Sequence, residues 1–142
     1  MPSVPGACHC RNLTYTLEWP DHEEMPFRKC SCSFCTKHGA FYAAHPRAAL
    51  LGRVKSRAAL SRYTFGTGTA EVFLCARCGV APWVASVVEG KTYAVVNAAT
   101  FDVPAVAKDA PVLSLDGDTV ERRLARRKRS WIATVEIAFE GE

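Results

Sequence analysis

The seven cysteines of this 142-residue chain constrain its fold more than any other feature. They form three short groups, Cys8-x-Cys10, Cys30-x-Cys32-x-x-Cys35 and Cys75-x-x-Cys78. An odd number of cysteines cannot all pair in disulfides, and a reducing compartment does not maintain such bonds. Sulfurs separated by one or two residues are typical of metal sites, because the backbone can fold around one ion. The sequence therefore predicts a chain stabilised by thiolate-bound zinc.

The last cysteine group has the pattern of a zinc knuckle. Cys75-x-x-Cys78 is followed by Gly79, which is free to adopt the positive φ that such a turn often requires. One knuckle supplies two ligands, whereas a structural zinc takes four. Cys8 and Cys10, just before an expected strand, are the natural second pair.

The middle group, Cys30, Cys32 and Cys35, then remains. Three protein ligands with one exchangeable position are the pattern of a catalytic zinc. Spacing alone leaves two alternatives open. In the first, Cys30 and Cys32 bind one metal together with Cys75 and Cys78, which leaves Cys8 and Cys10 spare. In the second, His38 completes the middle group as a closed Cys₃His site.

The composition predicts one globular domain over residues 1–142, with 49% hydrophobic and 23% charged residues. The longest apolar run, residues 80–88, is broken by Pro82 and Ser86, so we expect no membrane segment. The N-terminus lacks a basic n-region and a hydrophobic h-region. We therefore expect no signal peptide and a cytoplasmic protein.

Short strands dominate the expected secondary structure. Apolar residues alternate with polar ones over 13–19, as in a half-buried strand. Further strands are expected at 41–45, 63–65, 70–74, 80–88 and 92–97, the second and third of them joined by a Gly66-Thr67-Gly68 turn. The aromatic residues on strand-like segments are expected in the core: Trp19, Phe73, Trp83, Tyr93 and Trp131.

Helices are expected to be few. Residues 46–51 could form a turn or two, and Asp118 with Glu121 resembles a capping box that opens a helix over 119–128. A strand over 131–139 follows. The predicted class is mainly β with minor helix.

Positive charge is concentrated in the expected C-terminal helix. The whole chain carries a net charge of +4, and residues 121–129 contain one acid and six cations: Arg122, Arg123, Arg126, Arg127, Lys128 and Arg129. The rest of the chain is close to neutral, and no aromatic platform is interleaved with these cations. We expect a solvated helix face here and no nucleic-acid surface.

Three segments closely resemble the glutathione-dependent formaldehyde-activating enzyme family, which includes the centromere protein V domain. They are residues 6–10 (Gly-Ala-Cys-His-Cys), 30–37 (Cys-Ser-Cys-Ser-Phe-Cys-Thr-Lys) and 73–79 (Phe-Leu-Cys-Ala-Arg-Cys-Gly). Val95-Val96-Asn97 followed by Phe101-Asp102 is similar to a further family segment. The resemblance covers about residues 5–104, with 105–142 expected as a C-terminal extension packing on this domain.

The resemblance implies a β-tent fold with two Zn²⁺ ions per chain. A structural zinc would be held by Cys8, Cys10, Cys75 and Cys78, and a labile, catalytic zinc by Cys30, Cys32 and Cys35. The β-tent is shared with a guanine-nucleotide-exchange-like zinc protein that is not an enzyme, so fold alone does not determine function.

The expected function is that of a zinc-dependent carbon–sulfur lyase-type enzyme. It would add a small thiol such as glutathione to formaldehyde or another aldehyde and form an S-hydroxymethyl thiol. No obvious general base accompanies the cysteines, and the candidates are His9, His22, His38 and His45. The alternatives are a non-catalytic zinc-stabilised binding module and, third, a redox sensor using free thiols. A homodimer is an open alternative to a monomer.

Overall fold

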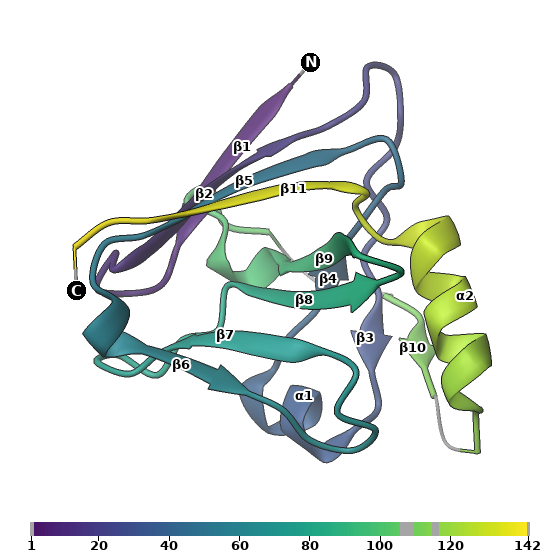
Figure 1. Cartoon of the computed structure of the whole chain (residues 1–142). Helices are drawn as coiled ribbons and strands as arrows, with labels where there is room; N and C mark the ends of the chain where they lie inside the picture. Colours follow the sequence, from purple (N-terminus) through teal and green to yellow (C-terminus); the bar gives the residue numbers. More distant parts are fainter. Residues whose placement is uncertain (1, 106–109, 115–116, 142) are drawn as a thin grey trace.

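Two β-sheets pack face to face in this computed structural model, which describes residues 2–105, 110–114 and 117–141 (Figure 1). The first sheet has the order β1-β2-β5-β11 and consists of β1 (Ser3–Ala7), β2 (Leu13–Glu18), β5 (Ala49–Val54) and β11 (Thr134–Phe139). The second has the order β4-β9-β8-β7-β6 and consists of β4 (Tyr42–Ala43), β9 (Lys91–Asn97), β8 (Trp83–Val88), β7 (Glu71–Cys75) and β6 (Leu60–Tyr63).

The remaining elements are short and lie around these sheets. Strands β3 (Lys29–Cys30) and β10 (Val112–Leu113) pair in parallel. The helices are α1 (Ser33–His38) and α2 (Val120–Ser130), with 3₁₀ turns η1 (Arg57–Ala59) and η2 (Ala98–Thr100). The prediction of a mainly β fold with minor helix is confirmed. None of the described helices has the length and apolar character needed to cross a bilayer.

The core between the two sheets is centred on Trp83. Its side chain is fully buried and meets Tyr15 of β2 edge-on, with ring centroids 6.2 Å apart. Gly52 of β5 permits this approach, because a Cβ there would lie 3.1 Å from the Trp83 ring. The prediction that Trp83 packs in the core is confirmed, as it is for Trp19, Phe73 and Tyr93, whereas Trp131 is only half-buried.

Residues 46–51 do not form the helical turns expected from the sequence. Pro46 and Arg47 form a single turn, and Ala49–Leu51 belong to β5, which lies between β2 and β11 and buries Leu50 and Val54. Sheet pairing on both sides thus overrides the weak local helix signal.

Helix α1 was not expected. It begins after Cys32, whose sulfur accepts the backbone N–H of Cys35, and it ends at Gly39 with a φ of 62°. Cysteine is not among the usual capping residues, so the cap gives no recognisable sequence signal.

The expected C-terminal helix and strand both form, but each begins at a later residue than predicted. Thr119 caps α2 by accepting the backbone N–H of Arg122, whereas Asp118 pairs with Arg126. The helix therefore runs over Val120–Ser130, and the following strand starts at Thr134 instead of 131.

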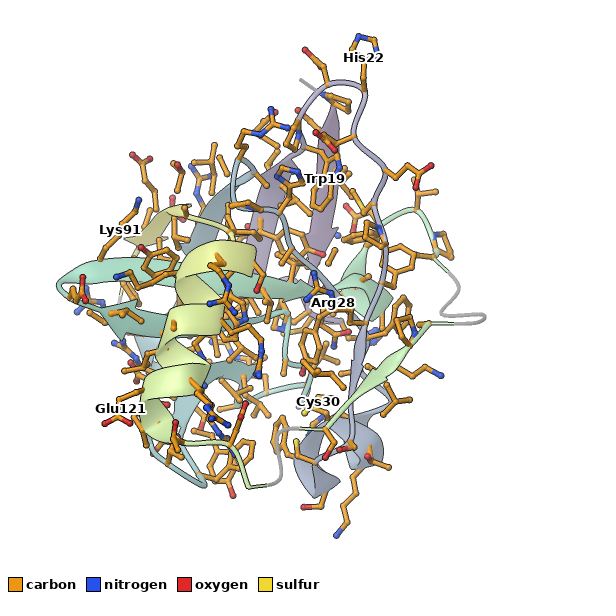
Figure 2. The ribbon with its side chains drawn as sticks, turned by 90° about the vertical axis from the view of Figure 1, so that its right-hand side faces the viewer. Trp19, His22, Arg28, Cys30, Lys91 and Glu121 are labelled. Atoms are coloured by element: carbon orange, nitrogen blue, oxygen red, sulfur yellow. The ribbon has the colours of Figure 1, made fainter. Side chains whose placement is uncertain are left out.

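Arg127 anchors α2 to the second sheet. Its guanidinium donates to the carbonyl of Thr69 at 3.2 Å, to Thr69 Oγ1 at 2.8 Å and to Ser86 Oγ at 3.0 Å, and it lies 5.0 Å from the Trp131 ring centroid. Figure 2 shows α2 in front of the sheet strands. Arg127 is buried, so its charged guanidinium has lost contact with water. Its charge-assisted hydrogen bonds therefore hold α2 against the second sheet.

Replacement of Arg127 should therefore detach α2. We expect Arg127→Gln to lower the free energy of unfolding by about 2–3 kcal/mol, because hydrogen bonds to a charged donor are lost. Arg129→Gln, at an exposed position of the same helix, should stay within about 0.5 kcal/mol of the parent. Denaturant unfolding of both variants measures the difference, and equal effects would contradict the anchoring role.

Candidate metal centres

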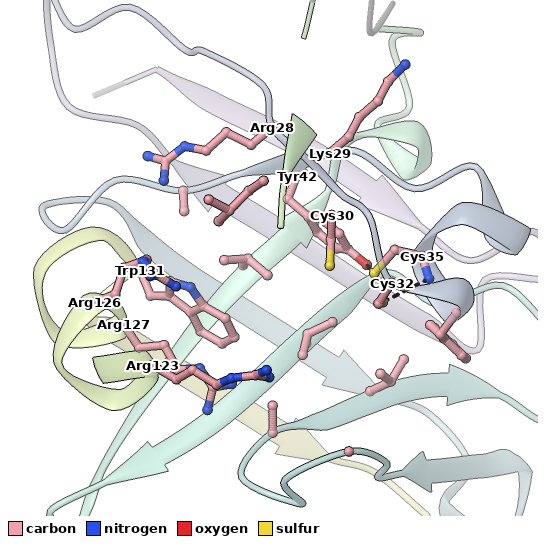
Figure 3. A pocket seen from close by; sticks show the side chains of 18 of the residues that line it. Arg28, Lys29, Cys30, Cys32, Cys35, Tyr42, Arg123, Arg126, Arg127 and Trp131 are labelled. Carbon is pink, nitrogen blue, oxygen red and sulfur yellow. Dashed lines mark hydrogen bonds between the residues drawn. The ribbon is translucent and has the colours of Figure 1, made fainter. Parts of the chain in front are cut away.

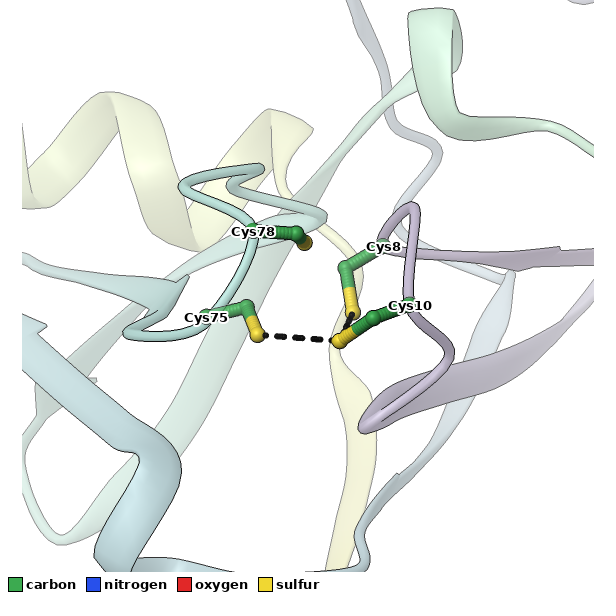
Figure 4. Close-up of side chains that lie close together, drawn as sticks. All are labelled: Cys8, Cys10, Cys75 and Cys78. Atoms are coloured by element: carbon green, nitrogen blue, oxygen red, sulfur yellow. Dashed lines mark hydrogen bonds between the residues drawn. The ribbon is translucent and has the colours of Figure 1, made fainter.

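Four cysteines from two distant turns meet at one point (Figure 4). The sulfurs of Cys8, Cys10, Cys75 and Cys78 all lie within 4.8 Å of one another. Cys10 Sγ lies 3.9 Å from Cys8 Sγ and 3.4 Å from Cys75 Sγ. Four thiolates around a tetrahedral zinc, at about 2.3 Å each, stand about 3.8 Å apart. The four-cysteine group therefore fits a closed zinc site.

Backbone turns on both sides position these sulfurs. Gly79, with a φ of 78°, donates its N–H to the carbonyl of Cys75 at 2.8 Å, which closes the knuckle. On the other side, Leu13 N–H donates to Cys8 Sγ at 3.3 Å. Cys8 and Cys75 are buried, and burial raises the pKa of the Cys8 thiol to about 12. Burial disfavours the negative charge of a free thiolate at Cys8. A bound metal cation would compensate that charge and so take the place of the thiol proton.

The other three cysteines form a second group on β3 and α1. The sulfurs of Cys30, Cys32 and Cys35 also lie within 4.8 Å of one another. A hydrogen bond from Cys35 lowers the pKa of Cys30 to about 5, while that same bond and burial raise the pKa of Cys35. Tyr42 Oη lies 3.1 Å from Cys35 Sγ, and burial, followed by the nearby Cys35, raises the pKa of Tyr42. Tyr42 thus stays protonated, and its hydroxyl would donate to this sulfur when Cys35 is a metal-bound thiolate.

The three-cysteine group opens on a cavity of about 230 Å³ (Figure 3). Apolar side chains cover much of its wall, including Ala44, Val72, Val84, Val95 and Trp131. Five cations also line it, namely Arg28, Lys29, Arg123, Arg126 and Arg127. No residue of the four-cysteine group is among the described lining residues. The four-cysteine group, in which Cys10 is exposed, thus lies outside this cavity and offers a complete set of four ligands, whereas the three-cysteine group opens on the cavity.

None of the four histidines joins either cysteine group among the described residues. The His38 ring stacks on Phe34, with centroids 4.3 Å apart. His45 lies against Trp19, and His9 and His22 are exposed. The geometry thus gives no support to a Cys₃His site or to a histidine base at the cavity.

The structure brings together the cysteines as the preferred partition predicted, and it adds residues that the sequence reasoning missed. Tyr42 was expected only as part of a strand, Trp131 as core, and the arginines of α2 as a solvated face. A usable signal did exist, since Arg123, Arg126, Arg127 and Ser130 have the i, i+3, i+4, i+7 spacing of one helix face.

Fold and site together define a class: small β-proteins with one closed and one accessible cysteine group, both suited to zinc. The sequence model of the glutathione-dependent formaldehyde-activating enzyme family matches residues 3–113. The chain belongs to this family. The match includes all seven cysteines and ends before α2.

A solved structure supports the same fold. The crystal structure of a Rhodobacter sphaeroides protein is 25% identical, with a TM-score of 0.56, and the alignment covers 77% of this chain and 99% of the other. Among curated proteins, no significant match is found.

The two groups should respond differently to loss of a ligand. We expect two zinc ions per chain, and one after either Cys75→Ser or Cys32→Ser. Cys75→Ser should lower the free energy of unfolding by more than about 3 kcal/mol, because metal binding at a core site is coupled to folding. Cys32→Ser, at the cavity, should cost less. Elemental analysis with thermal denaturation measures both effects.

His38→Ala serves as the matched control for these variants, since it removes a potential ligand that stacks on Phe34 and lies outside the cysteine groups. It should retain both ions. Loss of one zinc in this variant would contradict the three-cysteine assignment.

Tyr42 should tune the second group without binding the metal itself. Tyr42→Phe removes the hydroxyl that donates to Cys35 Sγ and should weaken zinc binding there roughly tenfold. The affinity of the four-cysteine group should not change. Competition with a chromophoric chelator resolves the two affinities, and an unchanged weaker site would show that this hydrogen bond has no role in metal binding.

Proposed function

We propose that this protein is a zinc-dependent carbon–sulfur lyase-type enzyme. It adds a small thiol such as glutathione to formaldehyde or another aldehyde. The observation that carries the proposal is the contrast between a closed four-cysteine group and a three-cysteine group that faces a cavity. Membership of a family named for glutathione-dependent formaldehyde activation supports it.

In this proposal the two cysteine groups have separate roles. Cys8, Cys10, Cys75 and Cys78 hold a structural zinc that couples the two sheets. The group of Cys30, Cys32 and Cys35 holds a labile, catalytic zinc. The free thiols that both sites require are maintained in a reducing compartment, so we place the enzyme in the cytoplasm.

The reaction joins the sulfur of a thiol to the carbonyl carbon. A sulfur lone pair forms the new S–C bond while the π pair of the C=O bond moves to oxygen. That oxygen takes up a proton and the thiol loses one, so the product is an S-hydroxymethyl thiol and the reverse reaction cleaves a carbon–sulfur bond. When bound, zinc supplies a positive charge beside which a thiol ionises near neutral pH.

The residues of the chain orient the reactants. Apolar side chains such as Val84 and Trp131 limit water access on one side of the cavity, and Tyr42 fixes the Cys35 sulfur. No carboxylate or imidazole occurs among the described lining residues, so we assign proton exchange to water at the cavity mouth. Catalysis then rests mainly on proximity and orientation.

Enzymatic rate above the spontaneous rate is the decisive measurement. Exchange NMR of glutathione and formaldehyde at equilibrium should give a rate at least roughly tenfold above buffer for the zinc-loaded protein. Cys32→Ser should return the rate to background, because it removes a ligand of the accessible group. His38→Ala should keep the parent rate.

A rate equal to background for a protein that holds both zinc ions would overturn the enzymatic proposal. The non-catalytic zinc-stabilised binding module would then account better for the fold. Catalysis that persists in Cys32→Ser would instead separate the activity from the three-cysteine group.

A further inference from the structure

Three aromatic side chains, which we call the aromatic cluster, pack together beside the three-cysteine cavity: Phe34, Tyr63 and Phe65. The ring of Phe34 lies 5.5 Å from that of Tyr63 and 5.3 Å from that of Phe65, measured between centroids. Tyr63 and Phe65 are 5.5 Å apart, and all three pairs of planes are inclined by 29° or less. Figure 1 shows α1, which carries Phe34, next to the loop that joins β6 to β7.

The rest of the chain leaves this cluster partly uncovered. Tyr63 is 47% exposed and Phe65 is 42% exposed, and the other described phenylalanine, tyrosine and tryptophan residues are buried or half-buried. None of the three members belongs to the core between the sheets. Aromatic surface left in water forgoes the free energy of burial, so an exposed patch of this kind is typical of a contact site.

The aromatic cluster continues into the wall of the cavity. Phe34 and Phe65 are lining residues, whereas Tyr63 lies outside the lining. Since Phe65 is exposed, the aromatic side is at the cavity mouth. The apolar lining also includes Val72, Val84, Val95 and Trp131. A cavity with such walls favours a ligand that carries a flat apolar group, because parallel-offset rings stack favourably.

Neither substrate in the family name has a group of this kind. Formaldehyde has one carbon and no carbon substituent on its carbonyl group. Glutathione is a polar tripeptide without an aromatic ring. The aromatic side of the cavity is therefore not explained by these two molecules.

The position of Phe34 indicates which reactant would carry the ring. Cys32 caps α1, Phe34 is the second residue of the helix and Cys35 is the third. In the proposed reaction the thiol sulfur meets the carbonyl carbon beside these cysteines. In an aromatic aldehyde the ring is bonded directly to that carbon. A ring stacked on Phe34 would thus hold the carbonyl carbon close to the helix turn that carries two of the cysteines.

We propose that the substrate is an aromatic aldehyde, whose ring stacks on Phe34 and Phe65. The inference rests on the proposed function and names the substrate class of its electrophile. The thiol sulfur forms a bond to the carbonyl carbon, and the π pair of the C=O bond moves to oxygen. The oxygen takes up a proton and the thiol loses one, so the product is a hemithioacetal and the ring is unchanged.

Two unreactive alcohols test recognition of the ring alone. Benzyl alcohol and cyclohexylmethanol have the same carbon skeleton, but only the first has a flat aromatic ring. NMR titration of the zinc-loaded protein should give roughly fivefold tighter binding of benzyl alcohol, because only this ring can stack. The saturated ring is the more hydrophobic of the two, so burial of apolar surface alone would reverse the preference.

Substitutions at Phe65 test where the ring binds. Phe65→Leu keeps an apolar side chain and should reduce the preference to below about twofold, whereas Phe65→Tyr keeps a ring and should retain it. Val87→Ala removes an exposed apolar side chain outside the lining and should also retain it. Equal binding of the two alcohols by the parent protein would overturn the inference.

A purely structural role of the cluster predicts a different result. If Phe34, Tyr63 and Phe65 only hold α1 in place, Phe65→Leu should weaken zinc binding at the three-cysteine group and leave the ring preference unchanged. That combination, measured by chelator competition beside the titration, would also overturn the inference.

Adduct formation distinguishes an aromatic aldehyde from an aromatic thiol. Benzaldehyde with glutathione places the ring on the aldehyde, and benzyl mercaptan with formaldehyde places it on the thiol. The rate above the spontaneous rate, measured by exchange NMR, should fall in Phe65→Leu more for the first pair than for the second. The opposite order would show that the ring belongs to the thiol and that the assignment is wrong.

Glutathione with formaldehyde reports the proposed function without an aromatic ring. If this pair reacts at an enzymatic rate and benzaldehyde gains nothing over its spontaneous rate, only the inference is wrong. If no aldehyde reacts above background on a protein that holds both zinc ions, the proposed function is wrong together with the assignment of the aldehyde. A retained preference for benzyl alcohol would then show a site for an aromatic ring without this chemistry.

Discussion

The four-cysteine group gathers sulfurs from both sheets at a single point, and the proposed structural zinc there is the link on which the rest of the structure would depend. Cys8 and Cys10 lie in the turn between β1 and β2 of the first sheet, while Cys75 ends β7 of the second and Cys78 lies in the turn that follows it. Residues 65 positions apart are thereby held in contact. Cys8 and Cys75 also belong to the hydrophobic core. A metal at this point would thus stabilise the same interface that the core side chains form, and loss of either would weaken both.

The three-cysteine group also offers thiolate ligands, but the backbone elements that carry it are shorter and have fewer neighbours than those of the four-cysteine group. Cys30 lies on the two-residue strand β3, Cys32 caps the six-residue helix α1 and Cys35 lies within it, all outside both main sheets. Strand β3 is held by β10 and by a bridge from Arg28 to Tyr42. Elements with so few neighbours open more easily than core strands. The proposed difference between a tightly bound and an exchangeable zinc would therefore follow from backbone support as well as from ligand number.

Much of this arrangement could be predicted from the sequence, because cysteine spacing and strand alternation are local signals. The alternation over 13–19 matches the buried face of β2, and the cysteine groups assemble in the preferred partition. Local signals failed where tertiary contacts decide the outcome. The second half of the segment 46–51 joins the central strand β5, and α1 is capped by a sulfur. The spacing of the arginines on α2 was visible, but the face that turns inward is selected by the bonds of Arg127 to Thr69 and Ser86.

The cysteines and the cations of α2 lie in separate parts of this chain. Residues 3–113, which the family model matches, contain every cysteine, whereas α2 adds a cationic side to the cavity. The helix is held at its C-terminal end, where Ile132 exchanges backbone hydrogen bonds with Ala94 of β9, and along its length by Arg127. Neither anchor involves a cysteine. Substitutions of Arg123 or Arg126, which leave the bonds of Arg127 in place, would therefore change the charge that lines the cavity without removing a cysteine or the anchor of the helix.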